Sequence, residues 1–222
     1  MIVIAVVQGK GGVGKTTLAI NLAGEIVSFG RSVNVVDADP QASATQWAEP
    51  RRLHFSVRQH QIGLRNTLIW VRDVLKSGTD FTIIDTPSGF GPAFETAVLI
   101  SDLAVIPCGP SSLDLNAAAK TVAKVRDVRR VDNGTSRCKI ALIPTRVDLA
   151  TEEGEQIRDE LAELGEPVGP SLSYDIEFVR AFTTGQAVSS LPANASAAQD
   201  IKRVSHFLLR QVLPRATAPE AD

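Results

Sequence analysis

A glycine-rich segment near the N-terminus constrains the fold of this chain more than any other feature. Its residues are Gly9, Lys10, Gly11, Gly12, Val13, Gly14, Lys15, Thr16 and Thr17. They satisfy the phosphate-loop pattern G-x-x-x-x-G-K-[ST], with an extra lysine directly after the first glycine. The apolar run Ile2–Val7 precedes the segment as a buried strand would, and apolar residues recur at helical spacing over Leu18–Val27. This context favours a phosphate-binding loop over a glycine-rich turn that binds nothing.

The loop predicts a site for the phosphates of a nucleotide. Glycines allow several backbone N–H groups to point at phosphate oxygens, and the start of the following helix favours an anion. Lys15 is expected to reach the β- and γ-phosphates, and the hydroxyl of Thr16 is expected to bind Mg²⁺. We expect the whole segment 9–17 to contact the nucleotide.

The rest of the sequence alternates short apolar runs with segments of helical patterning. The expected strands are Ile2–Val7, Ser32–Val36, Phe81–Ile84, Leu103–Pro107 and Lys139–Pro144. The expected helices are 15–29, 60–76, 92–100, 112–130 and 151–164. This alternation predicts an α/β fold with a mostly parallel, twisted sheet and helices on both faces. Together with the phosphate loop it indicates a single-domain P-loop NTPase fold, in which the ends of the strands gather along one edge.

Length and composition agree with one domain. The 222 residues are 44% hydrophobic and 22% charged, which is ordinary for a globular protein. We expect the domain to span 1–214 and the polar tail 215–222 to fray. No apolar run approaches the ~20 residues that cross a bilayer, and the start lacks a basic leader, so we expect a cytoplasmic chain. Cys108 and Cys138 fit no metal or redox spacing and are expected to pack as small apolar side chains.

Aspartates follow two of the expected strands. Asp37 and Asp39 follow the run Ser32–Val36, and two carboxylates at this spacing point the same way on an extended strand. We expect Asp37 to lie in the ATP site and Asp39 to orient the attacking water and support Mg²⁺. Asp85 follows Phe81–Ile84 and is expected to hold Mg²⁺ mostly through water. Asp is also common in turns, which is the alternative for the first pair.

The residues after the late strand Lys139–Pro144 bear on the choice of base. Related nucleotide-binding folds recognise the base at this place, and a guanine-specific site would have Asn-Lys-x-Asp. Thr145 and Arg146 depart from that pattern, which favours adenine, with Arg146 stacking on the ring. A surface arginine at the end of a strand is the alternative.

The net charge of −2 hides an uneven distribution of charge. Residues 120–139 and 202–215 are mostly basic, whereas residues 152–166 are mostly acidic. Such asymmetry can give one basic face to a protein of neutral average charge, although a charge run is more often a solvated helix face. With 120–139 as the alternative surface, the cations Arg180, Lys202, Arg203 and Arg210 are the candidates for contact with DNA, should the chain bind a nucleic acid.

These motifs resemble those of the ParA/MinD group of deviant Walker-A ATPases, and most closely the small ParF-like branch of ParA partition proteins. The similarity covers nearly the whole chain. The segments that carry it are Lys10–Thr17, Asp37–Gln41, Ile84–Asp85 and Ile106–Asp114.

The resemblance implies a homodimer that closes around two ATP molecules with Mg²⁺. In this family the lysine at the position of Lys10 reaches the phosphates bound to the other subunit, so Lys10, Lys15 and Asp39 are the expected catalytic residues. Relatives in the ATP state bind nucleoid DNA nonspecifically, and a ParB- or ParG-type adaptor with a basic N-terminal segment stimulates hydrolysis. The implied function is ATP-dependent segregation or positioning of plasmid DNA, chromosomal DNA or another cargo on the nucleoid.

Other branches and other functions fit the sequence less well. The final helix around 201–210 is amphipathic, but we expect Val204, Leu208 and Leu209 to pack in the core and not on a membrane. One alternative function is a metabolic ATP-dependent ligase of the same fold, similar to dethiobiotin synthetase, which gives Lys10 no clear role. The other is a scaffold or metal-cluster carrier, for which the chain lacks a C-x-x-C pair.

Overall fold

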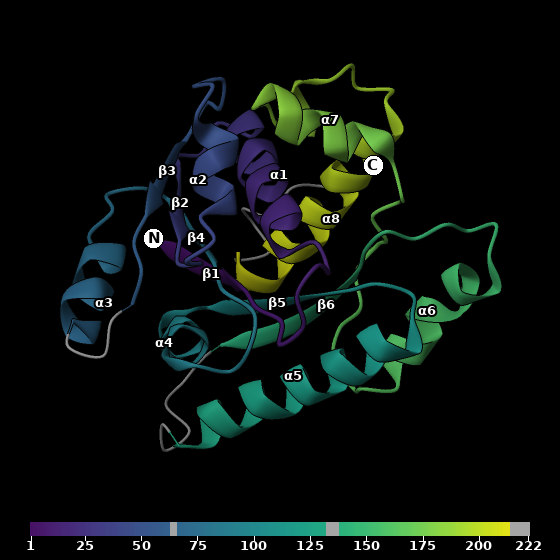
Figure 1. Cartoon of the computed structure of the whole chain (residues 1–222), viewed down its shortest axis with the longest axis horizontal. Coiled ribbons are helices and arrows are strands. Elements are labelled where there is room, and N and C mark those ends of the chain that lie inside the picture. The colour runs from purple at the N-terminus through teal and green to yellow at the C-terminus, as the bar shows by residue number, and fades with distance from the viewer. Residues whose placement is uncertain (63–65, 132–137, 214–222) are drawn as a thin grey trace.

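A six-stranded parallel sheet forms the centre of the molecule (Figure 1). The structure, a computed structural model, describes residues 1–62, 66–131 and 138–213. The spatial order of the strands is β3-β2-β4-β1-β5-β6, which confirms the expected α/β fold. Their bounds are β1 (Ile2–Val6), β2 (Val33–Asp37), β3 (Ser56–Gln59), β4 (Phe81–Asp85), β5 (Leu103–Cys108) and β6 (Lys139–Pro144). The tail predicted over 215–222 lies outside the described residues.

Helices cover both faces of the sheet. They are α1 (Lys15–Ser28), α2 (Ser43–Ala48), α3 (Thr67–Leu75), α4 (Pro92–Ile100), α5 (Ser112–Val131), α6 (Glu152–Ala162), α7 (Ile176–Thr184) and α8 (Ser196–Val212), with a short 3₁₀ helix η1 (Val188–Ser190). One buried cluster joins a face of the sheet to α1, α2, α7 and α8, and a second joins the other face to α3, α4, α5 and α6. Figure 1 shows these layers, with α1 and α8 on one side of the strands and α4 and α5 on the other.

Each central strand divides its side chains between these two clusters. In β1, Ile4 and Val6 belong to the cluster with α1, whereas Val3 and Ala5 belong to the cluster with α5. Side chains alternate along a strand, so burial of both faces requires apolar residues at successive positions. The central strands therefore read as near-continuous apolar runs, which is why the sequence predicts them within one or two residues.

The structure also contains elements that the sequence patterns do not indicate, namely β3, α2 and α7. Strand β3 has the sequence Ser-Val-Arg-Gln and none of its four side chains is fully buried. Among the strands that the structure describes, it pairs only with β2. An edge strand of this kind carries no apolar run that a pattern could reveal. The helix expected over 60–76 begins only at Thr67, because part of that span leads out of β3.

The last helix packs against the sheet as expected. Val204 and Leu208 are fully buried and Leu209 is nearly so, which confirms their predicted place in the core. Cys108 and Cys138 are buried too, and burial raises the pKa of each thiol to about 12. Among the helices that the structure describes, none is both long enough and apolar enough to span a bilayer.

The strand register places the motif residues along one edge of the sheet. Asp37 at the end of β2 lies opposite Asp85 at the end of β4, and Asp85 lies opposite Val6 of β1. Because all the strands are parallel, the loops that follow them leave the sheet at the same edge. The phosphate loop, Asp37 and Asp85 therefore lie at the same edge of the sheet.

Candidate nucleotide-binding site

The phosphate loop connects β1 to α1 as the sequence predicts. Helix α1 begins at Lys15, and the residue before it, Gly14, has a φ of 93°. Gly12 has a φ of 74°, so two positions of the loop have a left-handed backbone that favours glycine. These turns leave the first N–H groups of α1 at the mouth of the site, where an anion is stabilised.

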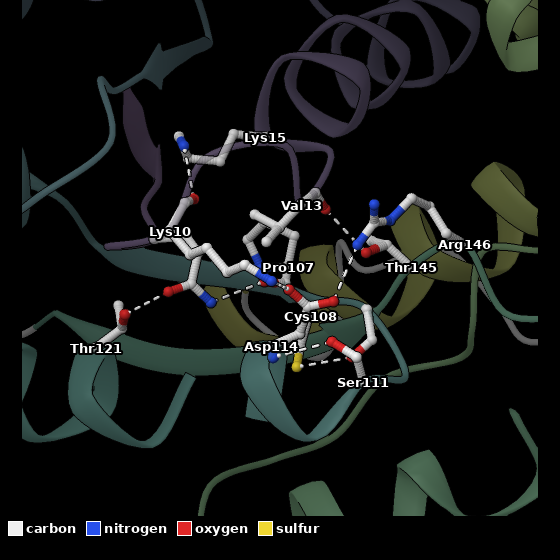
Figure 2. A network of polar contacts seen from close by, with 12 residues as sticks. Lys10, Val13, Lys15, Pro107, Cys108, Ser111, Asp114, Thr121, Thr145 and Arg146 are labelled. Carbon is white, nitrogen blue, oxygen red and sulfur yellow. Dashed lines mark hydrogen bonds and ion pairs between the residues drawn. The ribbon is translucent and has the colours of Figure 1, made fainter. Parts of the chain in front are cut away.

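A buried network that the sequence analysis missed supports the start of this loop (Figure 2). The N–H of Gly9 donates to Thr121 Oγ1 of α5 at 3.2 Å, and that hydroxyl donates to Gln8 Oε1 at 2.6 Å. The side-chain amide of Gln8 donates in turn to the carbonyl of Pro107 at 3.1 Å. Thr121 is separated from Gly9 by 112 residues, so no local pattern indicates the contact.

Lys15 lies under the loop in a position to meet phosphates. Only 6% of the residue is exposed, and its ammonium donates to Ser88 Oγ at 3.1 Å and to the carbonyl of Lys10 at 3.4 Å. Burial lowers the pKa of Lys15, and the carboxylates of Asp85 and Asp39 act against that shift. The ammonium therefore stands close to two acidic groups of the site.

Thr16 and Asp85 form the part of the site that fits Mg²⁺. The Thr16 hydroxyl donates to Asp85 Oδ2 at 2.7 Å, while Oδ1 of the same buried carboxylate has no hydrogen-bond partner among the described residues. Burial raises the pKa of Asp85 to about 7; the bond from Thr16 lowers it and the charge of Asp37 raises it. A cation, or a water molecule bound to a cation, would satisfy the orphaned oxygen.

The protein alone does not offer a complete metal site. Within residues 1–62, 66–131 and 138–213, no group of three or more His, Cys, Asp or Glu side chains could hold a metal ion. Mg²⁺ usually keeps several waters and is held by one or two protein groups together with phosphates. Thr16 and Asp85 thus fit a metal that arrives with a nucleotide.

Removal of the Thr16 hydroxyl is expected to weaken nucleotide binding only when Mg²⁺ is present. In Thr16→Ala, the concentration of Mg²⁺ needed for half-maximal binding of a fluorescent ATP analogue should rise roughly tenfold or more, because a hydroxyl ligand is lost. Thr16→Ser keeps the hydroxyl and should behave as the wild type does. An unchanged Mg²⁺ dependence in Thr16→Ala would contradict the assignment.

The structure separates the two aspartates that were expected to act together. Asp37 is fully buried and its oxygens accept from the N–H and hydroxyl of Thr45, both at 2.8 Å, and from the N–H of Asp39 at 3.2 Å. Both oxygens of Asp37 thus hold its own loop, and its place in the ATP site stays a prediction. The two aspartates are separated because β2 ends at Asp37, so strand alternation does not extend to Asp39.

Asp39 keeps its predicted place at the site. It is partly exposed, its Oδ1 accepts from the N–H of Gln41 at 2.9 Å, and it lines the cavity next to the phosphate loop. The carboxylate is thus available to water or to a nucleotide.

A cavity of about 490 Å³ extends from the phosphate loop toward α7. Gly12, Gly14 and Lys15 to Thr17 line one end. Three residues of the other walls, Asp39, Thr145 and Arg146, were predicted to lie at the site. The remaining residues of these walls were not predicted: Ser43, Trp47, Leu172, Ser173, Tyr174, Asp175, Phe178, Val179 and Phe182. Since the loop occupies the phosphate end, the apolar wall of α7 is left for the ribose and base.

Thr145 and Arg146 line this cavity, but each also has a contact within the protein. Thr145 is buried and its hydroxyl donates to the carbonyl of Val13 at 2.9 Å, which ties β6 to the phosphate loop. Arg146 has a φ of 56° and its guanidinium donates to Asp114 Oδ2 at 3.0 Å. Stacking of Arg146 on a base stays a prediction.

The wall formed by 172–175 and α7 carries no motif in the sequence. It is marked instead by an unusual exposure, because Tyr174 and Val179, which line the cavity, are 78% and 60% exposed. Apolar side chains this open beside a cavity indicate a ligand or partner surface.

Lys10 lies outside the cavity and pairs with its own chain. Its ammonium is 2.5 Å from Asp114 Oδ1, and the other oxygen of Asp114 accepts from Arg146, so one buried carboxylate holds two cations (Figure 2). Although burial acts against it, the hydrogen bonds from Lys10 and Ser111 and the charges of Lys10 and Arg146 hold the pKa of Asp114 below its usual range. Lys10 is not among the residues that line the cavity.

The cations expected to contact DNA lie on α7 and α8. Lys202, Arg203 and Arg210 are exposed on α8, and Arg203 and Arg210 share one face because they are two helical turns apart. Arg203 pairs with Asp200 at 2.5 Å, and Arg180 of α7 pairs with Glu177 at 2.6 Å.

The alternative basic surface on α5 is partly neutralised. Lys124 pairs with Glu95 of α4 at 2.7 Å, and Arg126 pairs at 2.7 Å with Glu166 of the acidic stretch. Arg137, which belongs to the same basic stretch, lies outside the described residues. The two charge runs of the sequence thus meet each other in the fold.

The chain is similar to known nucleotide-binding proteins. Residues 4–188 match the family described as the CobQ/CobB/MinD/ParA nucleotide binding domain. Two relatives are named maintenance of carboxysome distribution protein A. The one from Gloeobacter kilaueensis is 38% identical over 147 residues, which cover 66% of this chain and 63% of that protein. The one from Halothiobacillus neapolitanus is 27% identical over 95% of this chain and 96% of that protein.

A third relative and two solved structures extend this comparison. The chromosome-partitioning ATPase Soj of Thermus thermophilus is 25% identical over 94% of this chain and 96% of that protein. A McdA variant of Cyanothece solved with ATP has a TM-score of 0.76 at 19% identity, over 95% of this chain and 96% of that one. MinD of Pyrococcus horikoshii with Mg-ADP has a TM-score of 0.73 at 20% identity, over 93% of this chain and 95% of that one. At this identity the two structures show the fold.

Proposed function

The chain belongs to the CobQ/CobB/MinD/ParA nucleotide-binding domain family, and we propose that it is an ATP-dependent dimeric switch that positions or segregates a cargo on nucleoid DNA. It is an ATPase that uses ATP and Mg²⁺. The observation that carries the proposal is the phosphate loop, where buried Lys15 stands beside Thr16 and beside an Asp85 oxygen that has no hydrogen-bond partner in the part of the chain that the structure describes. This arrangement fits the γ-phosphate and its metal, whose loss on hydrolysis is what a switch detects.

The proposed switch depends on a second copy of the chain. Lys10 faces a surface hollow that also includes Asp114, Ser111 and Tyr174, next to the nucleotide cavity and not inside it. A partner's triphosphate in that position would compete with Asp114 for the ammonium of Lys10. The ATP-bound dimer would then be favoured because it neutralises phosphate charge that one subunit leaves exposed.

The proposed partners are nonspecific DNA and an adaptor of ParB or ParG type with a basic N-terminal segment. The two named relatives that act in carboxysome distribution, and Soj, which is named for chromosome partitioning, support a positioning role but differ in cargo. We propose that the chain is associated with the nucleoid while ATP is bound and released after stimulated hydrolysis.

DNA binding that needs ATP is the test of this proposal. Wild-type protein should bind DNA of any sequence with ATP and not with ADP, and binding should weaken steeply with salt, which fluorescence anisotropy can measure. A ligase of the same fold would bind ATP but not DNA. Absence of DNA affinity with ATP even at low salt would overturn the positioning role.

Replacing cations of α8 with neutral residues should reduce the salt dependence of DNA binding. Each lost phosphate contact reduces the log–log slope by ~0.9, so Arg203→Gln with Arg210→Gln should lose up to ~1.8 per protomer and most of the affinity at moderate salt. Glutamine at 203 can still donate to Asp200. The matched control is Lys124→Gln with Arg126→Gln on α5, which should keep DNA binding. The opposite result would place the DNA surface on α5.

A further inference from the structure

Asp200 of α8 is a buried acid to which the sequence analysis assigned no role. Its side chain is only 6% exposed. One oxygen accepts from the backbone N–H of Ser173 at 2.8 Å, and the other accepts from Arg203 at 2.5 Å. A buried carboxylate is stabilised only when such donors satisfy both oxygens, so this geometry fixes α8 to the segment that contains Ser173.

Ser173 belongs to the wall of the nucleotide cavity, and the backbone pairing around it determines where its N–H points. Val147, just after β6, donates to the carbonyl of Leu172 at 3.0 Å and accepts from the N–H of Tyr174 at 2.9 Å. In a parallel bridge of this kind the residue between the two, Ser173, points its N–H to the opposite side. Asp200 occupies that side and satisfies a group that would otherwise be buried without a partner.

Ser173 places this contact at the nucleotide cavity. Ser173 lines the cavity, and its hydroxyl is buried with no hydrogen-bond partner among the described residues. The phosphate loop fills the opposite end of the same cavity, so the segment 172–175 lies where the ribose and base would be. A shift of this segment would therefore change the space for a nucleoside.

We propose that Asp200 is a positioning residue for the nucleoside end of the nucleotide site. Through the N–H of Ser173 it holds 172–175 at the distance from the phosphate loop that a nucleoside triphosphate requires. Arg203 balances the charge of the buried carboxylate from the solvent side. This role rests on the proposed use of the cavity for ATP and extends it to a residue outside the cavity wall.

The test compares ATP with inorganic tripolyphosphate, which has the phosphates and no nucleoside. Asp200→Ala should weaken ATP binding about tenfold, because the Ser173 N–H loses its acceptor and the wall moves. The same variant should bind tripolyphosphate with Mg²⁺ as the wild type does. Asp200→Asn keeps a carbonyl oxygen for Ser173 and should bind ATP within about threefold of the wild type.

The matched control is Glu177→Ala on α7, which removes the acid of a similar i,i+3 pair with arginine but no contact to Ser173. It should leave both affinities unchanged. Should Asp200→Ala fail to fold, Ser173→Pro removes the N–H and the hydroxyl of Ser173, whereas Ser173→Ala removes the hydroxyl alone. Ser173→Pro should then show a larger selective loss for ATP than Ser173→Ala does.

Three outcomes overturn the role of Asp200. They are unchanged ATP affinity in Asp200→Ala, equal weakening of ATP and tripolyphosphate, and failure of Asp200→Asn to restore ATP binding. Wild-type protein that binds neither ligand would overturn the nucleotide site itself, which distinguishes that failure from the failure of the positioning role.

Discussion

Lys15→Ala is expected to abolish ATP binding. The ammonium of Lys15 is buried under the phosphate loop, where little water could replace it. It donates to the carbonyl of Lys10 in the loop and to Ser88 Oγ, and the lysine of a phosphate loop is expected to meet the β- and γ-phosphates. Loss of a buried charge-assisted contact costs on the order of a few kcal/mol, which raises a dissociation constant roughly a hundredfold.

Equilibrium binding of a fluorescent ATP analogue with Mg²⁺ measures this effect directly. Lys76→Ala, which removes an exposed lysine after α3, is the control for a change of charge alone. Lys15→Arg keeps a positive charge but places a larger group in a buried space, so we expect it to restore little binding. Undiminished ATP affinity in Lys15→Ala would contradict the assignment of the whole site.

The phosphate end of the site was predictable because its chemistry depends on neighbours in the sequence. Glycines at 12 and 14 provide the left-handed turns, and Lys15 and Thr16 begin the helix that follows. The sheet was predictable for a similar reason, since a central strand that is buried on both faces consists almost entirely of apolar residues.

The supports of the site depend instead on partners far away in the chain. Asp114 holds Lys10 across 104 residues, Thr121 holds Gly9 across 112, and Asp200 holds Ser173 across 27. A polar residue on a helix can be exposed to solvent or paired with another group, and the sequence pattern is the same in both cases. Only the packed fold shows which partner it has. The contacts of Asp37 with Thr45 and with the N–H of Asp39 have the same origin, because they depend on how the chain turns after β2 ends at Asp37.

Asp39→Ala should separate ATP binding from hydrolysis. Asp39 lies at the wall of the cavity with one oxygen accepting from the N–H of Gln41, and the hydrogen bonds of Lys15 and Thr16 go to other groups. If it orients the attacking water, its loss should reduce hydrolysis ~10²-fold or more while ATP still binds. The proposed ATP-bound dimer should then accumulate, because hydrolysis would no longer release it.

Asp37→Ala provides the contrast that makes this prediction sharp. Asp37 holds Thr45 and the N–H of Asp39, so its loss should loosen the whole loop and lower the thermal midpoint as well as activity. Single-turnover hydrolysis, ATP affinity and molecular mass in solution with ATP would be measured for both variants. Normal turnover in Asp39→Ala would move the water-orienting role to another acid, and loss of ATP binding in Asp39→Ala would make it a ligand of the nucleotide and not of the water.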